Sequence, residues 1–412
     1  SVVAAAEALA GLPGVRFLPA LRRGNVHGAL DMGLAPGVLP GRVALADGRD
    51  WYGAAWPGLP EEPGLDAAGV IAAAADGRIQ ALVLLGADPV SDFPDRQLAR
   101  RAMAGAGFVV AVDAFLTESS RQADVVLPAA TFAERPGTTT NLEGRVTRLG
   151  QKIVGRGVSW PDWMIAGELA RRLGADLGLE TLEQIWDEIE RMAPSHHGLT
   201  RALLGDARYR DGVVPPLPEP PPPGVRPPGL AATDTSTGTT ADVPAAVDPM
   251  ADPGIDAVET QGIPATAVDA GPEPVPPPSQ PPTPAPPLIS FQGVGAPAPL
   301  PPLDAYSLRL VSGRHLYGQG TLTRHAPSLA PLGKPPCARA NPSDLDRLGM
   351  GHGGRVRVRS NKASFVVDVE PDPGVPRGSL WLAFNAGDDG GVSAGDLIDA
   401  SAPVTDVRVE TP

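Results

Sequence analysis

The chain has 412 residues, 42% of them hydrophobic and 20% charged, which is long enough for two or more domains that each bury a core. Its formal net charge of -13 argues against general nucleic-acid binding, because neutralising phosphates requires clustered lysine and arginine. A single cysteine, Cys337, excludes an internal disulfide, a zinc knuckle and a cysteine-ligated iron–sulfur cluster within these residues.

The N-terminal residues 1–14 predict an amphipathic helix, because their apolar side chains recur at helical spacing. They lack a basic region and an initiating methionine, so they do not resemble an intact signal peptide, and no 18-residue apolar run predicts a membrane span. We therefore expect a fragment that begins partway through a domain of a larger protein. Residues 15–19 predict a buried strand.

The next segment, residues 22–42, predicts a loop punctuated by glycine. Its Arg22, Arg23, Asn25 and His27 could contact an anion, but such side chains more often cap turns or bond to the backbone. We expect the second role, and no metal site at His27.

An alternation of helices and strands follows. Two tryptophans and a tyrosine in residues 43–64 are expected to anchor turns on the surface of a core. Helices are predicted over 66–75 and 95–103, and strands over 79–86 and 108–112. This order predicts a doubly wound, mainly parallel α/β sheet.

The stretch from residue 109 to residue 150 contains the strongest pattern. After a polar segment over 117–123 that can form one or two helical turns, a strand is predicted over 125–127, and a long polar loop begins after Pro128. This arrangement fits the carboxyl edge of an α/β sheet, where ligands or partners usually bind. The loop carries Glu134, Gly137, Asn141, Glu143, Gly144 and Arg145.

Two helices, over 162–173 and 182–192, are predicted to cover a face of the sheet. The pair His196 and His197 follows the second helix in a loop. Adjacent histidines are a weak metal signal, and we expect both side chains to be solvent-exposed.

Residues 211–302 differ completely in composition, because they hold 27 of the 50 prolines and ten acidic residues against one base, Arg226. Such a sequence favours polyproline II stretches and disorder rather than a packed core. We divide the chain into an N-terminally incomplete α/β domain (1–155), its helical extension (156–210), a disordered, acidic, proline-rich linker (211–304) and a second domain (305–412).

The second domain is predicted to be rich in strands, since valines alternate with arginines before a turn at residues 361–362. Arg355, Arg357 and Arg359 are expected on a solvated face, where they could also meet an acidic neighbouring subunit. The predicted elements are strands over 306–311, 355–360, 364–369 and 379–384 and a helix over 344–348.

The run LVLLGADPVSDFPD and the stretch after residue 109 resemble the molybdopterin oxidoreductase family, in which similar segments border a pterin cofactor cleft. The loop RRGNVHGALDMGLAPGVLPG further resembles the family of the large iron–sulfur subunit (G type) of bacterial NADH–quinone oxidoreductase, respiratory complex I, in its actinobacterial form. The matching positions of the first pattern are Thr117, Glu118, Ala123, Asp124, Val125, Val126, Leu127, Pro128, Glu134, Gly137, Thr138, Asn141, Glu143, Gly144 and Arg145.

The resemblance implies a molybdopterin-dinucleotide-binding-like, double-psi-type β-barrel for residues 305–412. In cofactor-bearing relatives the positions of His315, Asn341 and Asn385 lie near the nucleotide, although Asn341 also suits a helix cap. Thr147 stands where such relatives often have glutamine. We therefore expect Glu143 and Arg145 to pair with each other or with backbone and to shape the loop without holding a cofactor.

Two functions compete. The resemblance implies a cofactor-free scaffold of the complex I peripheral arm, part of a proton-pumping translocase that passes electrons from NADH to quinone. The iron–sulfur clusters of the subunit would lie in a preceding N-terminal part. Its partners would be the flavin-bearing, NADH-binding and iron–sulfur subunits, and the complex would lie at the cytoplasmic face of the bacterial plasma membrane. The alternative is part of a molybdopterin-guanine-dinucleotide oxidoreductase of the formate dehydrogenase or nitrate reductase type.

We assign no catalytic, cofactor-binding or metal-binding residue in this segment. An independent Rossmann-type enzyme is disfavoured, because no Gly-x-Gly-x-x-Gly follows a strand and no nucleophile and base are convincingly spaced.

Overall fold

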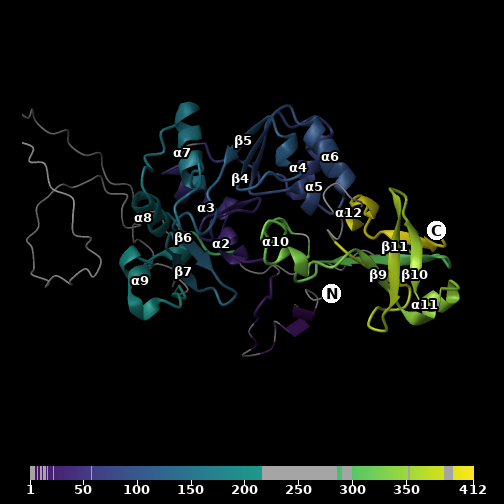
Figure 1. Cartoon of the computed structure of the whole chain (residues 1–412). Helices are drawn as coiled ribbons and strands as arrows, with labels where there is room; N and C mark the ends of the chain where they lie inside the picture. The colour runs from purple at the N-terminus through teal and green to yellow at the C-terminus, as the bar shows by residue number, and fades with distance from the viewer. Residues whose placement is uncertain are drawn as a thin grey trace, which may run out of the picture.

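The chain folds into an α/β part and a β-barrel, which lie side by side in the computed structural model (Figure 1). The structure describes all residues except 1–4, 7, 10–11, 13–14, 16, 22, 57, 216–284, 290–298, 319, 351–352 and 385–392. The predicted class, a mainly parallel α/β sheet followed by a barrel, is confirmed.

A parallel three-stranded sheet forms the centre of the α/β part, with β4 (Val109–Asp113) between β3 (Leu82–Leu85) and β5 (Val125–Pro128). Helices α4 (Ala67–Ala75) and α6 (Arg96–Gly105) cover one face. Each helix begins at an aspartate whose carboxylate accepts a backbone N–H of the first turn, at 2.7 Å in α4 and 2.8 Å in α6. These caps satisfy donors that the helix itself leaves unpaired.

The opposite face of the sheet is only partly covered. Helix α7 (Asp162–Arg172) packs Ile165 against Val112 and Ala129 near the carboxyl ends of the strands. On β3, however, the side chains of Val83 and Leu85 are 58% and 57% exposed.

Strand β3 is also an edge strand in the described part of the chain, since its one neighbour is β4. The backbone N–H groups of Leu82 and Gly86 donate to the carbonyls of Phe108, just before β4, and of Val112 in β4, at 2.8 Å each. Because backbone groups alternate in direction along a strand, those of Val83 and Leu85 face the open edge.

A second group of small elements packs beside the sheet. The remaining elements of the α/β part are α2 (Val26–Asp31), β1 (Val38–Leu39), β2 (Val43–Ala44), α3 (Leu45–Gly53), α5 (Pro89–Asp92), η1 (Ser120–Gln122), β6 (Gly137–Thr140), β7 (Val146–Leu149), α8 (Leu182–Met192), η2 (Pro194–His196), α9 (Arg201–Gly205) and η3 (Ala207–Tyr209).

The segment predicted as surface turns, residues 43–64, instead contains helix α3. Trp51 and Tyr52 on this helix are buried, and both donate hydrogen bonds to the carbonyl of Met192, at 3.0 and 2.8 Å. The prediction of turns was wrong, because residues 45–53 form a helix, whereas the aromatic side chains do anchor the segment on a core, in one cluster with Leu39, Val43 and Met192.

Two further predictions of local structure were wrong. The described residues of the range 15–19 do not form a buried strand, and Phe17 and Leu18 are exposed, since an apolar run forms a strand only where a neighbouring strand can pair with its backbone. The loop expected over 22–42 includes helix α2 and strand β1. The amphipathic helix expected over 1–14 lies mostly outside the described residues.

The second part is a closed barrel in which the strands follow the order β10, β11, β9, β12, β8, β13. Leucine and valine side chains of its strands fill the interior, and Leu308, Leu380 and Leu382 are almost completely buried. Its elements are β8 (Ser307–Gly313), α10 (Thr321–Arg324), η4 (Ala330–Leu332), β9 (Cys337–Ala340), α11 (Pro342–Arg347), β10 (Gly354–Arg359), β11 (Ser364–Pro371), β12 (Ser379–Ala383), α12 (Ala394–Leu397) and β13 (Asp406–Glu410).

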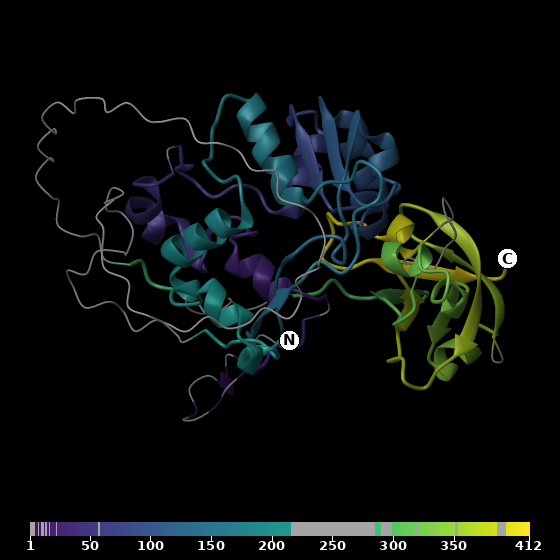
Figure 2. The same cartoon turned by 60° about the vertical axis from the view of Figure 1, so that its left-hand side comes forward.

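Polar contacts join the barrel to the start of α6. Asp95, the cap of this helix, also accepts from Lys362 Nζ and from the Ala400 backbone N–H, both at 3.3 Å. Arg96 lies 3.4 Å from Asp396 of α12. In both orientations α12 lies next to α6 (Figures 1 and 2), so these contacts set the position of the barrel against the sheet.

The predicted proline-rich linker, residues 211–304, falls mostly outside the described residues, but two described pieces of it pack on the α/β part. Val213 pairs with Val146 through two backbone hydrogen bonds, at 2.8 and 2.9 Å. Leu288 forms an antiparallel bridge with Val43, and Ala285 packs on the cluster around Tyr52. Two points of this insert, Val213 and Leu288, are therefore held by the first domain.

Candidate functional site at the carboxyl edge of the sheet

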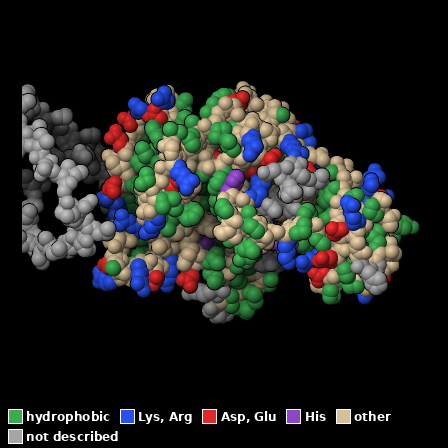
Figure 3. Space-filling view, in the orientation of Figure 1, with side chains coloured by type: hydrophobic (Ala, Val, Ile, Leu, Met, Phe, Trp, Pro, Cys, Tyr) green, Lys and Arg blue, Asp and Glu red, His purple; other side chains and the backbone are tan. Residues whose placement is uncertain are grey.

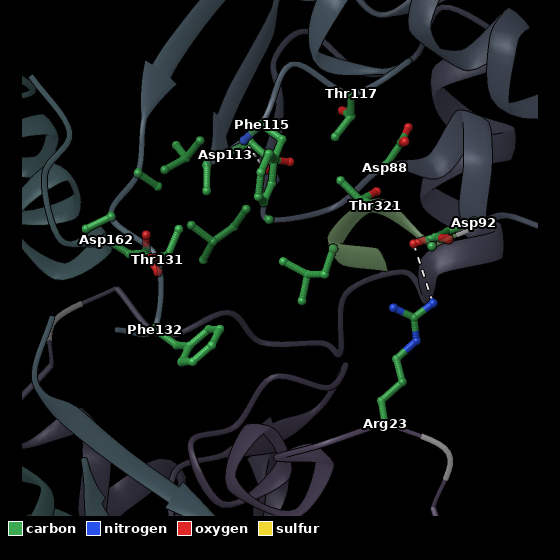
Figure 4. Close-up of a pocket in the computed structure, with 18 of the residues that line it drawn as sticks. Arg23, Asp88, Asp92, Asp113, Phe115, Thr117, Thr131, Phe132, Asp162 and Thr321 are labelled. Carbon is green, nitrogen blue, oxygen red and sulfur yellow. Dashed lines mark hydrogen bonds and ion pairs between the residues drawn. The ribbon is translucent and has the colours of Figure 1, made fainter. Parts of the chain in front are cut away.

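A cavity of about 530 Å³ lies where the three parallel strands end (Figure 4). Its floor is formed by residues that follow β3, β4 and β5. Helix α10 and Arg314 of the second domain close it from the other side. The site thus combines the carboxyl edge of the sheet with a segment about 200 residues away in the sequence.

Four carboxylates line the cavity. Asp88 follows β3 and Asp113 ends β4. Both line the cavity because the carboxyl ends of parallel strands meet at one edge of the sheet. Asp92 ends the short helix α5, and Asp162 begins α7. The sequence patterns did not single out these aspartates, although their positions directly after buried strands were a usable signal for Asp88 and Asp113.

Each arginine of the cavity lies in an ion pair with one of these carboxylates. Asp92 lies 3.4 Å from Arg23 and 2.5 Å from Arg314, and Asp162 lies 2.6 Å from Arg135. Figure 4 shows the pair between Arg23 and Asp92. The positive charge of the cavity is therefore already matched by the protein's own side chains.

Asp113 and Asp88 are two further carboxylates of the cavity, beyond those in the ion pairs with arginine. Burial raises the pKa of Asp113, backbone N–H groups of Phe115 and Ala114 oppose this, and the charges of Asp88 and Asp162 add to the increase. Asp88 accepts the backbone N–H and hydroxyl of Ser119 with one oxygen, at 3.1 and 2.6 Å. Among the described side-chain atoms, its other oxygen has no hydrogen-bond partner.

Apolar side chains reach into the same space. Phe132 and Leu322 line the cavity, and the ring of Phe115 stacks on His325 with centroids 4.5 Å apart. The stack joins the sheet to the segment after α10. The cavity is thus bounded by two domains whose contact is partly aromatic.

The polar loop of the sequence pattern forms an antiparallel hairpin of β6 and β7 and not an irregular loop. Glu143 and Arg145 pair with each other at 2.7 Å, which confirms the predicted pairing. Asn141 accepts both of their backbone N–H groups at 2.9 Å, and Gly144 has a positive φ of 77° that suits glycine in the turn. Thr147 lies within β7 opposite Thr139, so this part of the pattern lies outside the cavity lining.

Two further residues of the pattern act locally. Glu134 accepts the backbone N–H of Thr131 at 2.8 Å, and this bond holds the pKa of Glu134 below its usual value. The backbone N–H of Thr117 donates to Ser120 at 2.6 Å, which closes the turn before β5. The pattern therefore fixes the backbone around the cavity more than it supplies groups to it.

The residues that the sequence suggested as possible anion contacts, near the start of the chain, bond to other groups of the protein. Asn25 accepts the Thr140 backbone N–H at 2.8 Å, and Arg42 lies 3.0 Å from His27 Nδ1. Arg23 does reach the cavity, through its pair with Asp92. Arg22 lies outside the described residues.

The two adjacent histidines differ from each other. His197 is exposed as predicted, but His196 is only 2% exposed, so that prediction was wrong. The turn η2 folds His196 back against Trp186, with ring centroids 6.0 Å apart, and Ser195 Oγ lies 2.8 Å from His196 Nδ1. Burial lowers the pKa of His196. Among the described residues, no cluster of three or more potential metal ligands is present.

In the barrel, two of the residues expected near a nucleotide, His315 and Asn341, make contacts within the protein. His315 packs on Trp381 at 4.9 Å, with its pKa lowered first by burial and then by Arg339 and Lys334. Asn341 caps α11 and donates to the Val375 carbonyl at 2.9 Å. Asn385 lies outside the described residues. Arg314 was missed, because only the fold brings it to the sheet.

Comparison with known proteins identifies both parts of the chain. Residues 12–172 match the family model described as molybdopterin oxidoreductase, and residues 308–408 match the molydopterin dinucleotide binding domain. The F420-dependent formate dehydrogenase 2 subunit alpha of Methanococcus maripaludis is 28% identical over 388 residues, which cover 91% of this chain and 48% of that protein.

Two other similarities complete the comparison. A G-type subunit of the NADH-quinone oxidoreductase of Rhizobium meliloti is 37% identical over 196 residues, 47% of this chain and 23% of that protein. The structure of acetylene hydratase from Pelobacter acetylenicus shares the fold, with a TM-score of 0.51 and 15% identity over 84% of this chain and 46% of that one. The chain thus spans at most about half the length of these relatives. In the described part, no helix is long and apolar enough to cross a membrane.

Proposed function

Since the chain belongs to the molybdopterin oxidoreductase family and carries its molybdopterin-binding domain, we propose that it is a cofactor-free scaffold portion of a complex I-type subunit. In this proposal it is part of the large iron–sulfur subunit of a proton-pumping NADH–quinone oxidoreductase. The 37% identity to the G-type subunit of an NADH-quinone oxidoreductase, over 47% of the chain, supports this assignment.

The charge arrangement of the cavity is the observation that carries the proposal. A pterin dinucleotide contains a pyrophosphate, and binding such an anion requires donors with spare positive charge. All three arginines of the cavity are in ion pairs, and the four carboxylates outnumber them. The side chains present therefore do not fit the dinucleotide, because its phosphates would have to displace Asp92 and Asp162 while facing Asp88 and Asp113.

In this proposal the scaffold supports electron transfer by packing against the cluster-bearing parts of the subunit and holding them in position. Its one cysteine, Cys337, is half-buried with a pKa raised by burial, so these residues hold no cysteine-ligated cluster. In the proposal the clusters belong to other parts of the subunit. The flavin-bearing, NADH-binding and iron–sulfur subunits are its partners, at the cytoplasmic face of the bacterial plasma membrane.

Metal analysis of the intact protein tests the proposal. We expect molybdenum and pterin far below one equivalent per chain. One equivalent of molybdenum would overturn the scaffold assignment and would support the second candidate, a formate dehydrogenase-type oxidoreductase. The similarity to a formate dehydrogenase subunit favours that candidate, because it extends over 91% of the chain and includes both domains.

A charge-release experiment tests the reason for the assignment. Replacing Asp92 and Asp162 by asparagine frees the three arginines, so we expect the double variant to bind pyrophosphate at least tenfold more tightly than the unchanged chain. The matched control replaces Asp76 and Asp206, which pair with Arg78 and Arg208 outside the cavity lining. Equal binding by the unchanged chain and the double variant would contradict the argument.

A further inference from the structure

A second, smaller cavity of about 270 Å³ lies on the outside of the barrel, between strands β10 and β13. It is separate from the cavity at the sheet and shares no lining residue with it. Its lining consists of Ser307, Arg359, Ser360, Asn361, Asp406 and Arg408.

Two arginines face each other across this cavity. Arg359 of β10 and Arg408 of β13 are direct partners in the antiparallel register. Both point outward, since their strand neighbours Val358 and Val409 are buried in the barrel core. Directly opposed side chains have Cβ atoms about 5 Å apart, and like charges at this position destabilise a sheet.

The neighbouring acids leave this repulsion largely in place. In the described part of the chain, no carboxylate lies within salt-bridge distance of Arg359, and Glu410 stands opposite Arg357 instead. Asp406 lies 3.1 Å from Arg309. Arg408 lies 3.7 Å from Asp304, with both side chains more than half exposed, so water screens that pair.

A hydroxyl completes the arrangement. The Ser360 oxygen accepts the backbone N–H groups of Lys362 and Ala363, at 3.1 and 3.3 Å. These bonds occupy its lone pairs, so its own proton can be donated to a further acceptor. The amide nitrogen of Asn361 is already bonded to Asp399 at 2.9 Å.

We propose that this cavity binds an oxyanion, a phosphate or carboxylate group held between the guanidinium groups of Arg359 and Arg408 with the Ser360 hydroxyl as a third donor. Planar guanidinium groups match the geometry of such anions, and a bound negative charge removes the repulsion between the opposed arginines. On the face of the molecule that Figure 3 shows, basic and acidic side chains are interspersed. The proposal is independent of the function of the sheet cavity.

Calorimetric titration of the 412-residue chain tests the site, with inorganic phosphate and acetate as probes at an ionic strength held constant with sodium chloride. We expect saturable binding of at least one probe, and the tighter of the two identifies the source of the anion as a phosphate or a carboxylate. Arg408→Gln and Arg359→Gln should each weaken that binding at least tenfold, and Arg408→Lys should weaken it less.

Arg355→Gln is the matched control, because Arg355 lies on the same strand but opposite Asp368. It should leave anion binding unchanged. Without the probe, Arg408→Gln should unfold at the same temperature as the unchanged chain or at a higher one, since it removes the repulsion. Absence of binding by the unchanged chain, or equal binding by Arg408→Gln, would overturn the proposal.

Discussion

The barrel and the parallel sheet treat their strand edges differently. Every barrel strand has two hydrogen-bonded neighbours, and its leucines and valines form one enclosed core. The described sheet has three strands, and β3 presents an open edge with Val83 and Leu85 exposed. Parallel sheets are normally covered on both faces, and open apolar edges promote association. The difference indicates that the barrel is self-contained, whereas the sheet exposes surface suited to further packing.

The largest expected effect is a cavity in the barrel core. Leu382→Ala should lower the free energy of unfolding of the barrel by about 2–5 kcal/mol, because Leu382 is almost completely buried. Leu85→Ala on the exposed face of β3 should change stability by only about 0.5 kcal/mol. Denaturant unfolding followed by hydrogen exchange of the β12 and β3 amides measures both. Similar losses would show that the sheet face is covered after all.

The contact between the two regions is the next target. Asp95→Ala removes the α6 cap and the partner of Lys362, so we expect a loss of about 2–3 kcal/mol and a looser arrangement of the domains. Asp95→Asn keeps a capping oxygen and should lose less, which separates the cap from the ion pair. Small-angle scattering should show a larger radius of gyration for the alanine variant; an unchanged radius would mean that other contacts position the barrel.

The raised pKa of Asp113, at the end of β4, predicts how the stability of the folded protein depends on pH. Its pKa in the folded protein is raised above 3.8, so the folded state loses stability as pH rises from 3.8 through the raised value. Asp113→Asn should therefore raise the melting temperature at pH 7, and the gain should disappear below pH 3.8. Thermal unfolding at both pH values, with Asp76→Asn as the exposed control, measures this. A gain that is equal at both pH values would exclude the titration as its cause.

Association through the open edge should change with little effect on stability. Val83→Lys places a charge on the β3 edge, so it should alter the free energy of unfolding by only about 0.5 kcal/mol while reducing concentration-dependent self-association. Sedimentation velocity compares it with Val158→Lys, an exposed position outside the sheet. If the control reduces association equally, the edge has no special role.

The smallest effect is expected from cleavage of the proline-rich insert. Limited proteolysis should cut first between residues 211 and 302, as their composition predicts. The two fragments should still elute together, because Leu288 stays paired with Val43 and the barrel stays bound to α6. Separation of the fragments on gel filtration would contradict this, and first cleavage elsewhere would contradict the disorder prediction.

The sequence predicted elements well where the information is local. The helix over 182–192 has the predicted bounds, because Thr181 and Gln184 form a capping box that is visible in the sequence. The alternation around Val356 and Val358 likewise placed β10 and its exposed arginines. Such signals depend on neighbours a few residues away.

The errors and omissions depend on distant partners. Tyr52 donates a hydrogen bond to Met192 and packs with it in one cluster, and His196 packs on Trp186 after a tight turn. Neither contact follows from local periodicity. The candidate cavity was predicted only as an edge, because the pairing of Asp92 with Arg314 joins residues 222 positions apart. Local patterns therefore identified the strands and their ends, while the charge balance of the cavity required the tertiary structure.

The two anchored points of the insert, Val213 and Leu288, have a consequence for how this protein can vary. Val213 and Leu288 are both fixed on the α/β part, so the insert between them does not set the distance from the sheet to the barrel. For an unstructured chain between fixed points, doubling the length costs only about 0.6 kcal/mol in closure entropy. Insertions and deletions there should therefore accumulate freely in related sequences, and a short synthetic connector or a reporter domain should be tolerated in its place.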